Sequence, residues 1–410
     1  MSRNSFRARE WNSFRLDEII SLEYGKGLPE EERIKGDYPV VGSNGIVGYH
    51  KDALVKGPGI VIGRKGTIGA VSWIDTDFWA IDTTYYVKTK RDDVFLKWLF
   101  YELKYINLSA LTLSDVVPGL SREFAYAVKL PLPKFQEQQK IAEILQSVDN
   151  AIDKTKELIE KYKKMKQGLM YELFTRGITI EGKLRPSPEN APELYKDSLL
   201  GKIPKEWRVV TLNEIIDIKH GYAFRGEYFA DQPNEYVLLT PGNFHVDGGL
   251  YFTSENTKYY LGDFPAEYIL NNGDLLIVMT DLTKEMNILG NTVILEEKRK
   301  VLHNQRIGKI LIKDPQSLLD YYLLFLMNHD FCKNTIRRTA TGTTVRHTSP
   351  TRIKASIVPI CDYDEQKRIA AILLEANREI HSEEEYMNKL IEIKTGLMQD
   401  LLTGKVRVAS

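Results

Sequence analysis

Cysteine is scarce in this chain, and its scarcity limits the kinds of site that the sequence supports. Among 410 residues there are two cysteines, Cys332 and Cys361. They form no CxxC spacing, and no histidine is placed to complete a zinc cluster, so we predict neither a disulfide framework nor a structural metal site. This usage is typical of a reducing cytoplasm, which is the expected location.

Net charge and long apolar runs are lacking as well. The 56 basic residues balance 56 acidic residues, so any binding of nucleic acid requires local basic patches rather than overall charge. No apolar run approaches the roughly 20 residues of a membrane span, and the start MSRNSFRAREW lacks the apolar core of a signal peptide. We therefore expect no membrane association. The length predicts two or three domains.

Motifs for catalysis and cofactor binding are also missing. The Asn-Pro-Pro-Tyr-like motif and glycine-rich loop of an adenine methyltransferase do not occur, and the loop GRKGTIG (63–69) lacks the GxxxxGK[ST] spacing that binds nucleotide phosphates. Short acidic-x-Lys pieces lie on predicted helices without the upstream Pro-Asp strand of a nuclease. The seven histidines are scattered. We predict no enzyme, with no catalytic, cofactor-binding or metal-binding residue in this chain.

An internal repeat is the main positive feature of the sequence. EQQKIAEIL begins at Glu137 and its relative EQKRIAAIL begins at Glu365, an offset of 228 residues that KQGLM and KTGLM share. A second pair, EWNSFRLDEII and EWRVVTLNEII, has an offset of 196 residues, from Trp11 to Trp207. The repeated C-terminal segments therefore keep their length, while the parts between differ by 32 residues.

Each copy of the Glu-Gln motif opens a long amphipathic helix. Apolar residues recur at spacings of three and four along two stripes with matching polar breaks. The stripes are Ile141, Leu145, Val148, Ile152, Thr155, Ile159, Tyr162, Lys166, Leu169, Leu173 and Ile369, Leu373, Ala376, Ile380, Glu383, Met387, Leu390, Lys394, Leu397, Leu401. An ordinary core helix or a homodimeric coiled coil also fits one such stripe. Two matched stripes in one chain favour an antiparallel intramolecular coiled coil.

The remaining segments are rich in short β-branched and aromatic runs bounded by Gly, Pro, Asn and Asp. We predict an α+β fold with a pseudo-twofold internal repeat, in which two mixed, strand-rich domains are separated by two long helices. The expected boundaries are a first domain at 1–133, a long helix at 134–176, a linker at 177–205, a second domain at 206–360 and a long helix at 361–405.

Polar loops that mix basic, amide and hydroxyl side chains are the candidate binding sites, because such side chains suit base edges and phosphates. A solvated loop is the alternative for each one taken alone. The richest, IRRTATGTTVRH (336–347), has three arginines. The candidate DNA-binding residues are Asn44, Arg64, Lys65, Thr67, Ser121, Arg122, Tyr222, Arg225, Thr280, Lys284, Asn304, Gln305, Arg306, Arg337, Arg338, Thr343, Arg346 and His347. Residues Arg64 to Thr67 align roughly with Thr280 to Lys284.

With these features in order, the whole chain resembles the specificity subunit of type I restriction-modification systems. The resemblance rests on WNSFRLDEII, PKFQEQQKIAEIL and KQGLMYELFTRG, followed by KDSLLGKIPKEWRVVTLNEII, DYDEQKRIAAIL and KTGLMQDLLTGKV. The family pattern is a target recognition domain that opens with a Trp and a Leu-x-Glu-Ile-like strand, then a long helix, and then both again. One departure is Cys361 to Tyr363, which replaces the second proline of the first copy.

The resemblance implies a non-catalytic subunit that recognises double-stranded DNA. Each recognition domain is expected to read one half of a bipartite, asymmetric site, and the helices are expected to fix the spacer and to dock two modification subunits. Two restriction subunits join through the complex. S-adenosylmethionine, ATP and Mg are used by those partners, so no cofactor is expected in this chain. A specificity subunit of a type IIB-like system, or a coiled-coil scaffold that binds proteins, are the alternatives.

Overall fold

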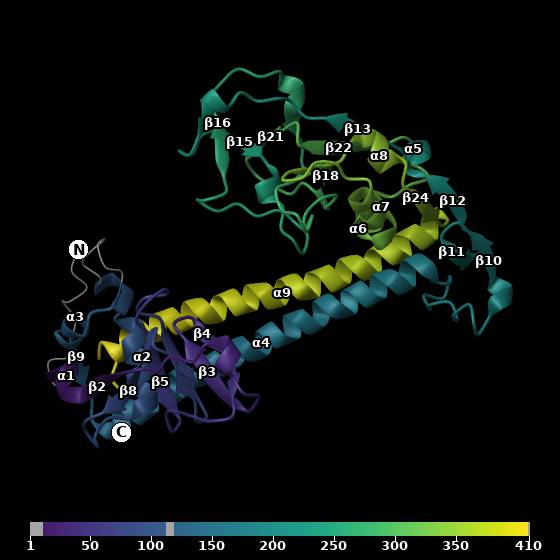
Figure 1. Cartoon of the computed structure of the whole chain (residues 1–410). Coiled ribbons are helices and arrows are strands. Elements are labelled where there is room, and N and C mark those ends of the chain that lie inside the picture. The colour runs from purple at the N-terminus through teal and green to yellow at the C-terminus, as the bar shows by residue number, and fades with distance from the viewer. Residues whose placement is uncertain (1–10, 112–118, 409–410) are drawn as a thin grey trace. The chain divides into compact units, whose positions relative to one another are not determined.

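The computed structural model describes residues 11–111 and 119–408, and the chain divides into two compact units (Figure 1). Unit 1 consists of Met1–Ile159 and Glu383–Ser410, and unit 2 of Glu160–Ser382. The two predicted long helices are present as α4 (Phe135–Thr175) and α9 (Tyr363–Leu402), and each contributes residues to both units. The content of strands and helices confirms the predicted α+β class. Among the described helices, none combines the length and the apolarity needed to cross a bilayer.

Unit 1 is built on a four-stranded sheet of order β2-β8-β5-β6 and a three-stranded sheet of order β4-β3-β7, in which β3 and β7 are parallel. A short pair, β1-β9, precedes α4. The elements are β1 (Asn12–Arg15), α1 (Leu16–Ile19), β2 (Ile20–Tyr24), η1 (Glu30–Glu32), β3 (Tyr38–Gly42), β4 (Gly45–His50), β5 (Gly59–Gly63), β6 (Val71–Ile74), β7 (Trp79–Ala80), β8 (Thr84–Thr89), α2 (Leu96–Tyr105), η2 (Leu108–Leu111), α3 (Arg122–Tyr126) and β9 (Lys129–Leu132).

Unit 2 has the same plan with more strands. Its sheets are β13-β22-β18-β20, β14-β16-β15-β21-β17 with β15 and β21 parallel, and the pairs β12-β24, β19-β23 and β10-β11. The elements are η3 (Pro192–Leu194), β10 (Tyr195–Ser198), β11 (Gly201–Pro204), β12 (Arg208–Thr211), α5 (Leu212–Ile215), β13 (Ile216–His220), η4 (Gly226–Tyr228), β14 (Phe229–Ala230), β15 (Tyr236–Leu239), η5 (Pro241–Asn243), β16 (Lys258–Tyr260), η6 (Ala266–Tyr268), β17 (Ile269–Leu270), β18 (Leu275–Val278), β19 (Thr280–Asp281), β20 (Thr292–Ile294), β21 (Lys300–His303), β22 (Ile307–Ile312), α6 (Asp320–Asn328), α7 (Asp330–Arg338), β23 (Arg346–His347), α8 (Pro350–Lys354) and β24 (Ile357–Ile360).

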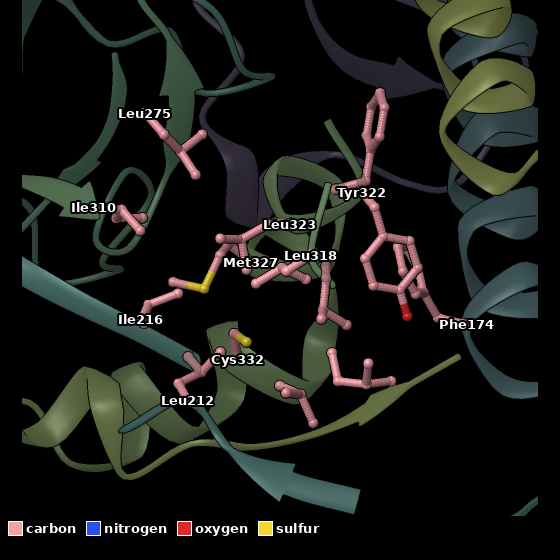
Figure 2. Close-up of a cluster of buried hydrophobic side chains, with 14 of the residues drawn as sticks. Phe174, Leu212, Ile216, Leu275, Ile310, Leu318, Tyr322, Leu323, Met327 and Cys332 are labelled. Atoms are coloured by element: carbon pink, nitrogen blue, oxygen red, sulfur yellow. The ribbon is translucent and has the colours of Figure 1, made fainter. Parts of the chain in front are cut away.

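The most apolar strand of each unit is buried on both faces, which explains its continuous apolar run. In β5, Ile60 and Ile62 join the core under α2, whereas Val61 joins a second core with Val41 of the neighbouring sheet. Successive side chains of a strand point to opposite faces, so a strand between two apolar layers must be apolar throughout. β18 follows the same rule in unit 2: Leu275 belongs to the core shown in Figure 2, and its neighbours along the strand alternate between two cores.

The long helices pair in antiparallel fashion within each unit, as predicted. In unit 1 the Asp149 carboxylate of α4 lies 2.5 Å from the ammonium of Lys394 in α9. In unit 2, Leu173 of α4 and Leu373 of α9 share one core, and Figure 2 shows Phe174 of α4 beside Tyr322 of α6. Every position of both predicted stripes is buried or half-buried. The helices therefore bury the stripes that the sequence predicts.

The segment that was predicted as a Leu-x-Glu-Ile strand is instead a single helical turn in both units. In each turn the carboxylate of the third residue accepts a hydrogen bond from the backbone N–H of the residue before the turn. In α1 the Arg15 N–H donates to Glu18 at 2.6 Å, and in α5 the Thr211 N–H donates to Glu214 at 2.7 Å. This bond satisfies the backbone amide of the residue before the turn in each unit. It stabilises the turn between β1 and β2, and likewise between β12 and β13, against the β-branched character of the sequence.

The first residue of the repeated motif, Glu137, joins three parts of unit 1. Its carboxylate accepts a hydrogen bond from the Trp11 indole at 3.1 Å and two from Arg407, from Nε at 2.7 Å and Nη2 at 2.9 Å. Trp11 lies just before β1, and Arg407 follows the C-terminal end of α9. The motif thus ties the start of α4 to the entry strand and to the exit from the other long helix.

Glu365 has the same role in unit 2 with deeper burial. It accepts the Trp207 indole at 3.0 Å, the amide of Ile178 at 2.7 Å and the guanidinium of Arg185, whose Nη2 lies at 3.0 Å. An added Cβ on Gly177, which has φ +66°, would lie 2.4 Å from the Trp207 ring. Glycine is therefore required for the chain to leave α4 beside this cluster.

The second residue of the motif fixes the loop before the shorter helix. The Gln138 amide accepts from the backbone N–H of Phe95 at 2.7 Å and donates to the carbonyl of Asp93 at 2.8 Å, immediately before α2. Gln366 accepts from the backbone N–H of Leu319 at 2.9 Å, immediately before α6. Both glutamines are fully buried. The repeated Glu-Gln sequence thus makes equivalent hydrogen bonds in each unit, at the start of each long helix.

The segment at 177–205, expected to be an extended connection, contains ordered structure. It includes the hairpin β10-β11 and a bridge between Ile178 and Leu184. The ammonium of Lys196 donates to the carbonyls of Lys205 and Trp207 at 2.7 and 2.6 Å. Backbone and side-chain hydrogen bonds thus fold this Pro- and Gly-rich segment onto the entry of unit 2.

Candidate nucleic-acid interface

Three candidate loops of unit 1 lie against one another: the β3-β4 turn, the loop after β5 and the loop before α3. The amide of Leu120 donates to the carbonyl of Arg64 at 2.9 Å and joins two of them. A Cβ on Gly63 would lie 2.9 Å from the carbonyl oxygen of Ser43, so the β3-β4 turn touches the loop after β5 at a glycine. The sequence predicted these loops separately, and the fold brings them together.

Two arginines of unit 1 are stacked around one exposed tyrosine. The guanidinium carbon of Arg122 lies 3.8 Å from the Tyr24 ring centroid and that of Arg64 lies 5.2 Å from it. Arg64 also donates to the carbonyl of Asp82 from Nε at 3.2 Å and Nη2 at 2.8 Å. Tyr24 is 53% exposed, so stacking orients both cations at the surface. Burial raises the pKa of the adjacent Tyr85, which keeps its phenol neutral.

The other predicted residues of unit 1 surround this group. Asn44, Lys65 and Thr67 are exposed, whereas Ser121 and Arg122 are half-buried. The prediction of a loop at 119–123 was wrong at its end, because Ser121 is the N-cap residue of α3 and Arg122 begins the helix. Tyr24 was not predicted; its position before the GKG turn that follows a strand was the available signal.

The loops of unit 2 that follow β18, β21 and α7 are joined in the same way. The amide of Met279 donates to the carbonyl of Arg306 at 2.9 Å. β19 pairs with β23, which places Thr280 opposite His347, with the Thr280 hydroxyl oxygen 3.1 Å from the His347 Nδ1. The carbonyl of Tyr222 accepts the amide of Gln305 at 3.0 Å. Four predicted segments therefore form one continuous group.

The predicted residues of unit 2 differ in exposure. Arg225, Lys284, Gln305, Arg306, Arg338, Thr343 and His347 are exposed, Tyr222, Arg337 and Arg346 are half-buried, and Thr280 and Asn304 are buried. The Asn304 Oδ1 accepts the amide of Arg306 at 2.9 Å. The two buried side chains therefore shape the loops from which the others project. Arg225 belongs to a separate turn, where its guanidinium lies 3.8 Å from the Glu227 carboxylate.

The segment 336–347 was predicted as a loop throughout, and its first part is helical. Ile336, Arg337 and Arg338 form the last turn of α7. Ile336 is fully buried in the core of unit 2, and the His329 side chain caps the helix by accepting the amide of Phe331 at 3.3 Å. Burial of the isoleucine extends the helix into the arginines. The two arginines therefore project from a helix end, whereas Thr343, Arg346 and His347 lie beyond it.

The two groups of loops occupy equivalent places in the two units. Sheet β2-β8-β5-β6 corresponds in order to β13-β22-β18-β20, so β5 corresponds to β18. Arg64 follows β5, and Met279 follows β18. The amide of Leu120 donates to the carbonyl of Arg64, and the amide of Thr348 donates to that of Met279. The rough alignment of Arg64–Thr67 with Thr280–Lys284 agrees with this topology.

Two features of the unit 2 group escaped prediction because they depend on tertiary contacts. Asp281 is 1% exposed, and its carboxylate accepts hydrogen bonds from its own loop. Arg352, from α8, donates to the Thr341 hydroxyl at 3.0 Å. Polar residues that follow an apolar strand are a signal for a loop, but sequence alone does not tell which of them folds inward.

The buried titratable groups of unit 2 include two histidines and a lysine. Burial lowers the pKa of His303 and of His329 to about 4 each, and the His303 Nε2 lies 2.9 Å from the carbonyl oxygen of Ile307. Both histidines are neutral at pH 7. Burial also lowers the pKa of Lys333 to about 7, and this ammonium donates to the Asn291 amide oxygen. Within residues 11–111 and 119–408, no group of His, Cys, Asp and Glu side chains could hold a metal ion.

Comparison with a known family gives a match in both halves. Residues 8–164 and 204–392 match the family described as the type I restriction modification DNA specificity domain. The two matched ranges cover most of the chain, and each contains one group of loops described above.

Individual relatives agree. The chain is 24% identical over 418 residues to the type I restriction enzyme MjaVIII specificity subunit of Methanocaldococcus jannaschii, covering 97% of this chain and 93% of that protein. It is 25% identical over 324 residues to the putative MjaX specificity subunit of the same organism, covering 78% and 70%. A solved S subunit of a type I restriction-modification system from M. genitalium has a similar fold, with a TM-score of 0.61 at 15% identity over 98% of each chain.

Proposed function

Because this chain belongs to the type I restriction-modification DNA specificity family, we propose that each of its units reads one half of a bipartite DNA site. The observation that carries the proposal is the repeated frame with unlike loops. Equivalent strand ends present Arg64, Lys65 and Thr67 in unit 1 but Thr280, Leu282 and Lys284 in unit 2. Equal frames with different side chains suit two half-sites of different sequence.

In unit 1 the reading residues are the stacked Arg64 and Arg122, with Asn44, Lys65 and Thr67 around them. Arginine donates two parallel hydrogen bonds to guanine, and asparagine pairs in the same manner with adenine. The aromatic stack on Tyr24 limits the motion of the guanidinium groups, so less conformational freedom is lost when they bind. Lys65 and Thr67 suit phosphate contacts.

In unit 2 the exposed side chains of Gln305, Arg306 and His347 have the corresponding role, together with the half-buried Arg346. Gln305 and Arg306 lie in one turn between β21 and β22, and the buried Asn304 holds that turn by its bond to the amide of Arg306. A glutamine beside an arginine can distinguish adenine from guanine at adjacent positions. The arginines of α7 would then approach phosphates from the end of the helix.

The long helices would set the distance between the two half-sites and dock two modification subunits. The positions of their apolar stripes are already buried or half-buried within the two units, so a partner must use other faces. α9 exposes Tyr386, Ile391 and Ile393 in unit 1, and α4 exposes Met165 in unit 2. Met165 and Ile393 are equivalent at the offset of 228 residues. Equivalent apolar positions suit two copies of one partner.

The partners would supply the chemistry. Modification subunits would bring S-adenosylmethionine and methylate adenine, and restriction subunits would join through the complex with ATP and Mg. The chain itself would supply sequence recognition in the cytoplasm, where the DNA lies.

The proposal is tested by mapping modified adenines in the genome of cells that carry this protein and its modification subunit. A bipartite motif with a constant gap, lost when the gene for this chain is deleted and restored by its return, is the expected result. Methylation that is unchanged by the deletion would remove the recognition role.

A further inference from the structure

One apolar side chain stands among the polar recognition residues of unit 2. Leu282 directly follows β19 and is 65% exposed. The next residues, Thr283 and Lys284, are also exposed but polar. Single exposed leucines are common on protein surfaces, so exposure alone assigns no role. The way in which the loop holds Leu282, and the neighbours it has there, are more informative.

The backbone on both sides of Leu282 is fixed by the buried carboxylate of Asp281. One carboxylate oxygen accepts the amide and the hydroxyl of Thr283, both at 2.8 Å. The other accepts the amides of Ile288 and Leu289 at 2.7 and 3.1 Å. Bonds to an ionised acceptor are stronger than neutral ones. Because this carboxylate closes its own loop, Leu282 projects from an ordered backbone and loses little freedom on binding.

The surroundings of Leu282 are those of the proposed DNA-reading face. β19 pairs with β23, which places Asp281 opposite Arg346, and the amide that precedes β19 bonds to the carbonyl of Arg306. Lys284 and Glu285 follow with opposite charges. Their charges largely cancel, so the loop adds little general attraction to phosphates. A shape-specific contact is the better explanation for a rigid loop with an apolar tip.

We infer that Leu282 is a specificity-determining residue of unit 2 that contacts the 5-methyl group of a thymine in the major groove. This methyl group is the apolar group that base pairs present in that groove, where arginine and glutamine read the neighbouring polar edges. The inference rests on the proposed DNA recognition by unit 2. An apolar wedge between base steps is the other use of such a side chain, but that use does not depend on the methyl group.

The test uses the full chain in complex with its modification subunits and a fluorescent duplex that contains the mapped target. Each thymine is replaced in turn by deoxyuridine, which lacks only the methyl group. For the wild type, one replacement in one half-site should weaken binding about fourfold. Leu282→Ala should weaken binding to the thymine duplex about fivefold to twentyfold, and the difference between thymine and uracil at that position should disappear.

A matched control separates this role from general loss of apolar surface. Leu311 is a 42% exposed leucine near the far end of β22 from the turn that carries Arg306. Leu311→Ala should keep both the affinity and the thymine dependence of the wild type. Leu282→Met, which retains an apolar tip, should keep most of the thymine dependence. Thermal unfolding of Leu282→Ala should match that of the wild type, because the side chain is mostly exposed.

Three results would contradict the inference. Leu282→Ala could bind as tightly as the wild type, it could lose the same affinity on every thymine and uracil duplex, or no single uracil could affect wild-type binding. Failure of the proposed function looks different, because the wild-type complex would then bind target and scrambled duplexes equally. Selective binding by the wild type without dependence on Leu282 removes this inference alone.

Discussion

The two glutamate clusters that anchor the long helices are expected to differ in strength, although their sequences are equivalent. The perturbation is Glu365→Gln in unit 2 compared with Glu137→Gln in unit 1. Each substitution keeps the size of the side chain and removes its charge. In unit 2 the carboxylate is 1% exposed and Arg185 is 14% exposed, whereas in unit 1 the corresponding values are 4% for Glu137 and 39% for Arg407.

The expected loss of stability depends on whether each arginine side chain can reach water once the glutamate charge is removed. Arg185 stays largely buried, and the new amide would direct an N–H group toward its guanidinium, so Glu365→Gln leaves an uncompensated cation. Breaking a buried pair in this way costs about 3 to 5 kcal/mol. Arg407 can turn toward water, so Glu137→Gln loses charge-assisted bonds but not full solvation, which costs about 1 to 2 kcal/mol.

The assay is urea unfolding monitored by hydrogen exchange with mass spectrometry, which assigns each loss of protection to unit 1 or unit 2. Glu375→Gln, which removes an exposed partner of Arg378 on the same α9 helix, is the control and should change stability by less than about 0.5 kcal/mol. Adding Arg185→Met to Glu365→Gln should recover part of the loss. Equal losses of stability for Glu137→Gln and Glu365→Gln, or no recovery in the double variant, would show that burial of the arginine does not decide the cost.

Other predictions concern buried groups of unit 2 and one glycine. The pKa values of His303 and His329 are lowered to about 4 in the folded chain. As the pH falls, the unfolded chain therefore binds protons first, and unit 2 should lose stability between about pH 6.5 and about pH 4. Urea unfolding midpoints measured across this range test the prediction, and midpoints that do not change with pH would contradict it. The pKa of Lys333 is lowered to about 7, so its contribution to stability should rise from pH 7 toward 10, and Lys333→Met should flatten that rise in the same assay. Gly177→Ala places a Cβ against Trp207 at positive φ and should cost about 2 kcal/mol or more. Gly168→Ala, in open space within α4, should stabilise the protein by about 0.5 to 1 kcal/mol in thermal unfolding. Equal changes in stability for Gly177→Ala and Gly168→Ala would contradict the proposed clash at Gly177.

Periodicity predicted the long helices well because their stabilising contacts repeat along the sequence. The stripe from Ile141 to Leu173 is buried or half-buried throughout. The single turn at Leu16–Ile19 was missed because a hydrogen bond from the Arg15 amide to the Glu18 carboxylate, and not a periodic pattern, stabilises it. The helical state of Arg337 was missed for a related reason, because the burial of Ile336 depends on the tertiary core.

The candidate binding loops could be picked out by composition, but their assembly into two groups could not. Arg64 and Arg122 are remote in sequence and meet over Tyr24 only because the ends of β2 and β5, which belong to one sheet, lie beside the start of α3. The pairing of Glu137 with Arg407 and of Glu365 with Arg185 was also missed. A signal was present in GKVR and GKLR, which follow the two long helices, but without the fold nothing indicates which carboxylates these arginines meet.

Methylation motifs produced by variants of one unit at a time would show directly whether each unit reads one half-site. Arg122→Ala in unit 1 and Arg306→Ala in unit 2 would each be expressed with the modification subunit, and modified adenines would be mapped by single-molecule sequencing. We expect each variant to relax the sequence requirement, or to weaken recognition, at one half-site, a different half for each, while the gap stays constant. A variant that changes both halves, or the gap, would contradict the assignment of one half-site to each unit.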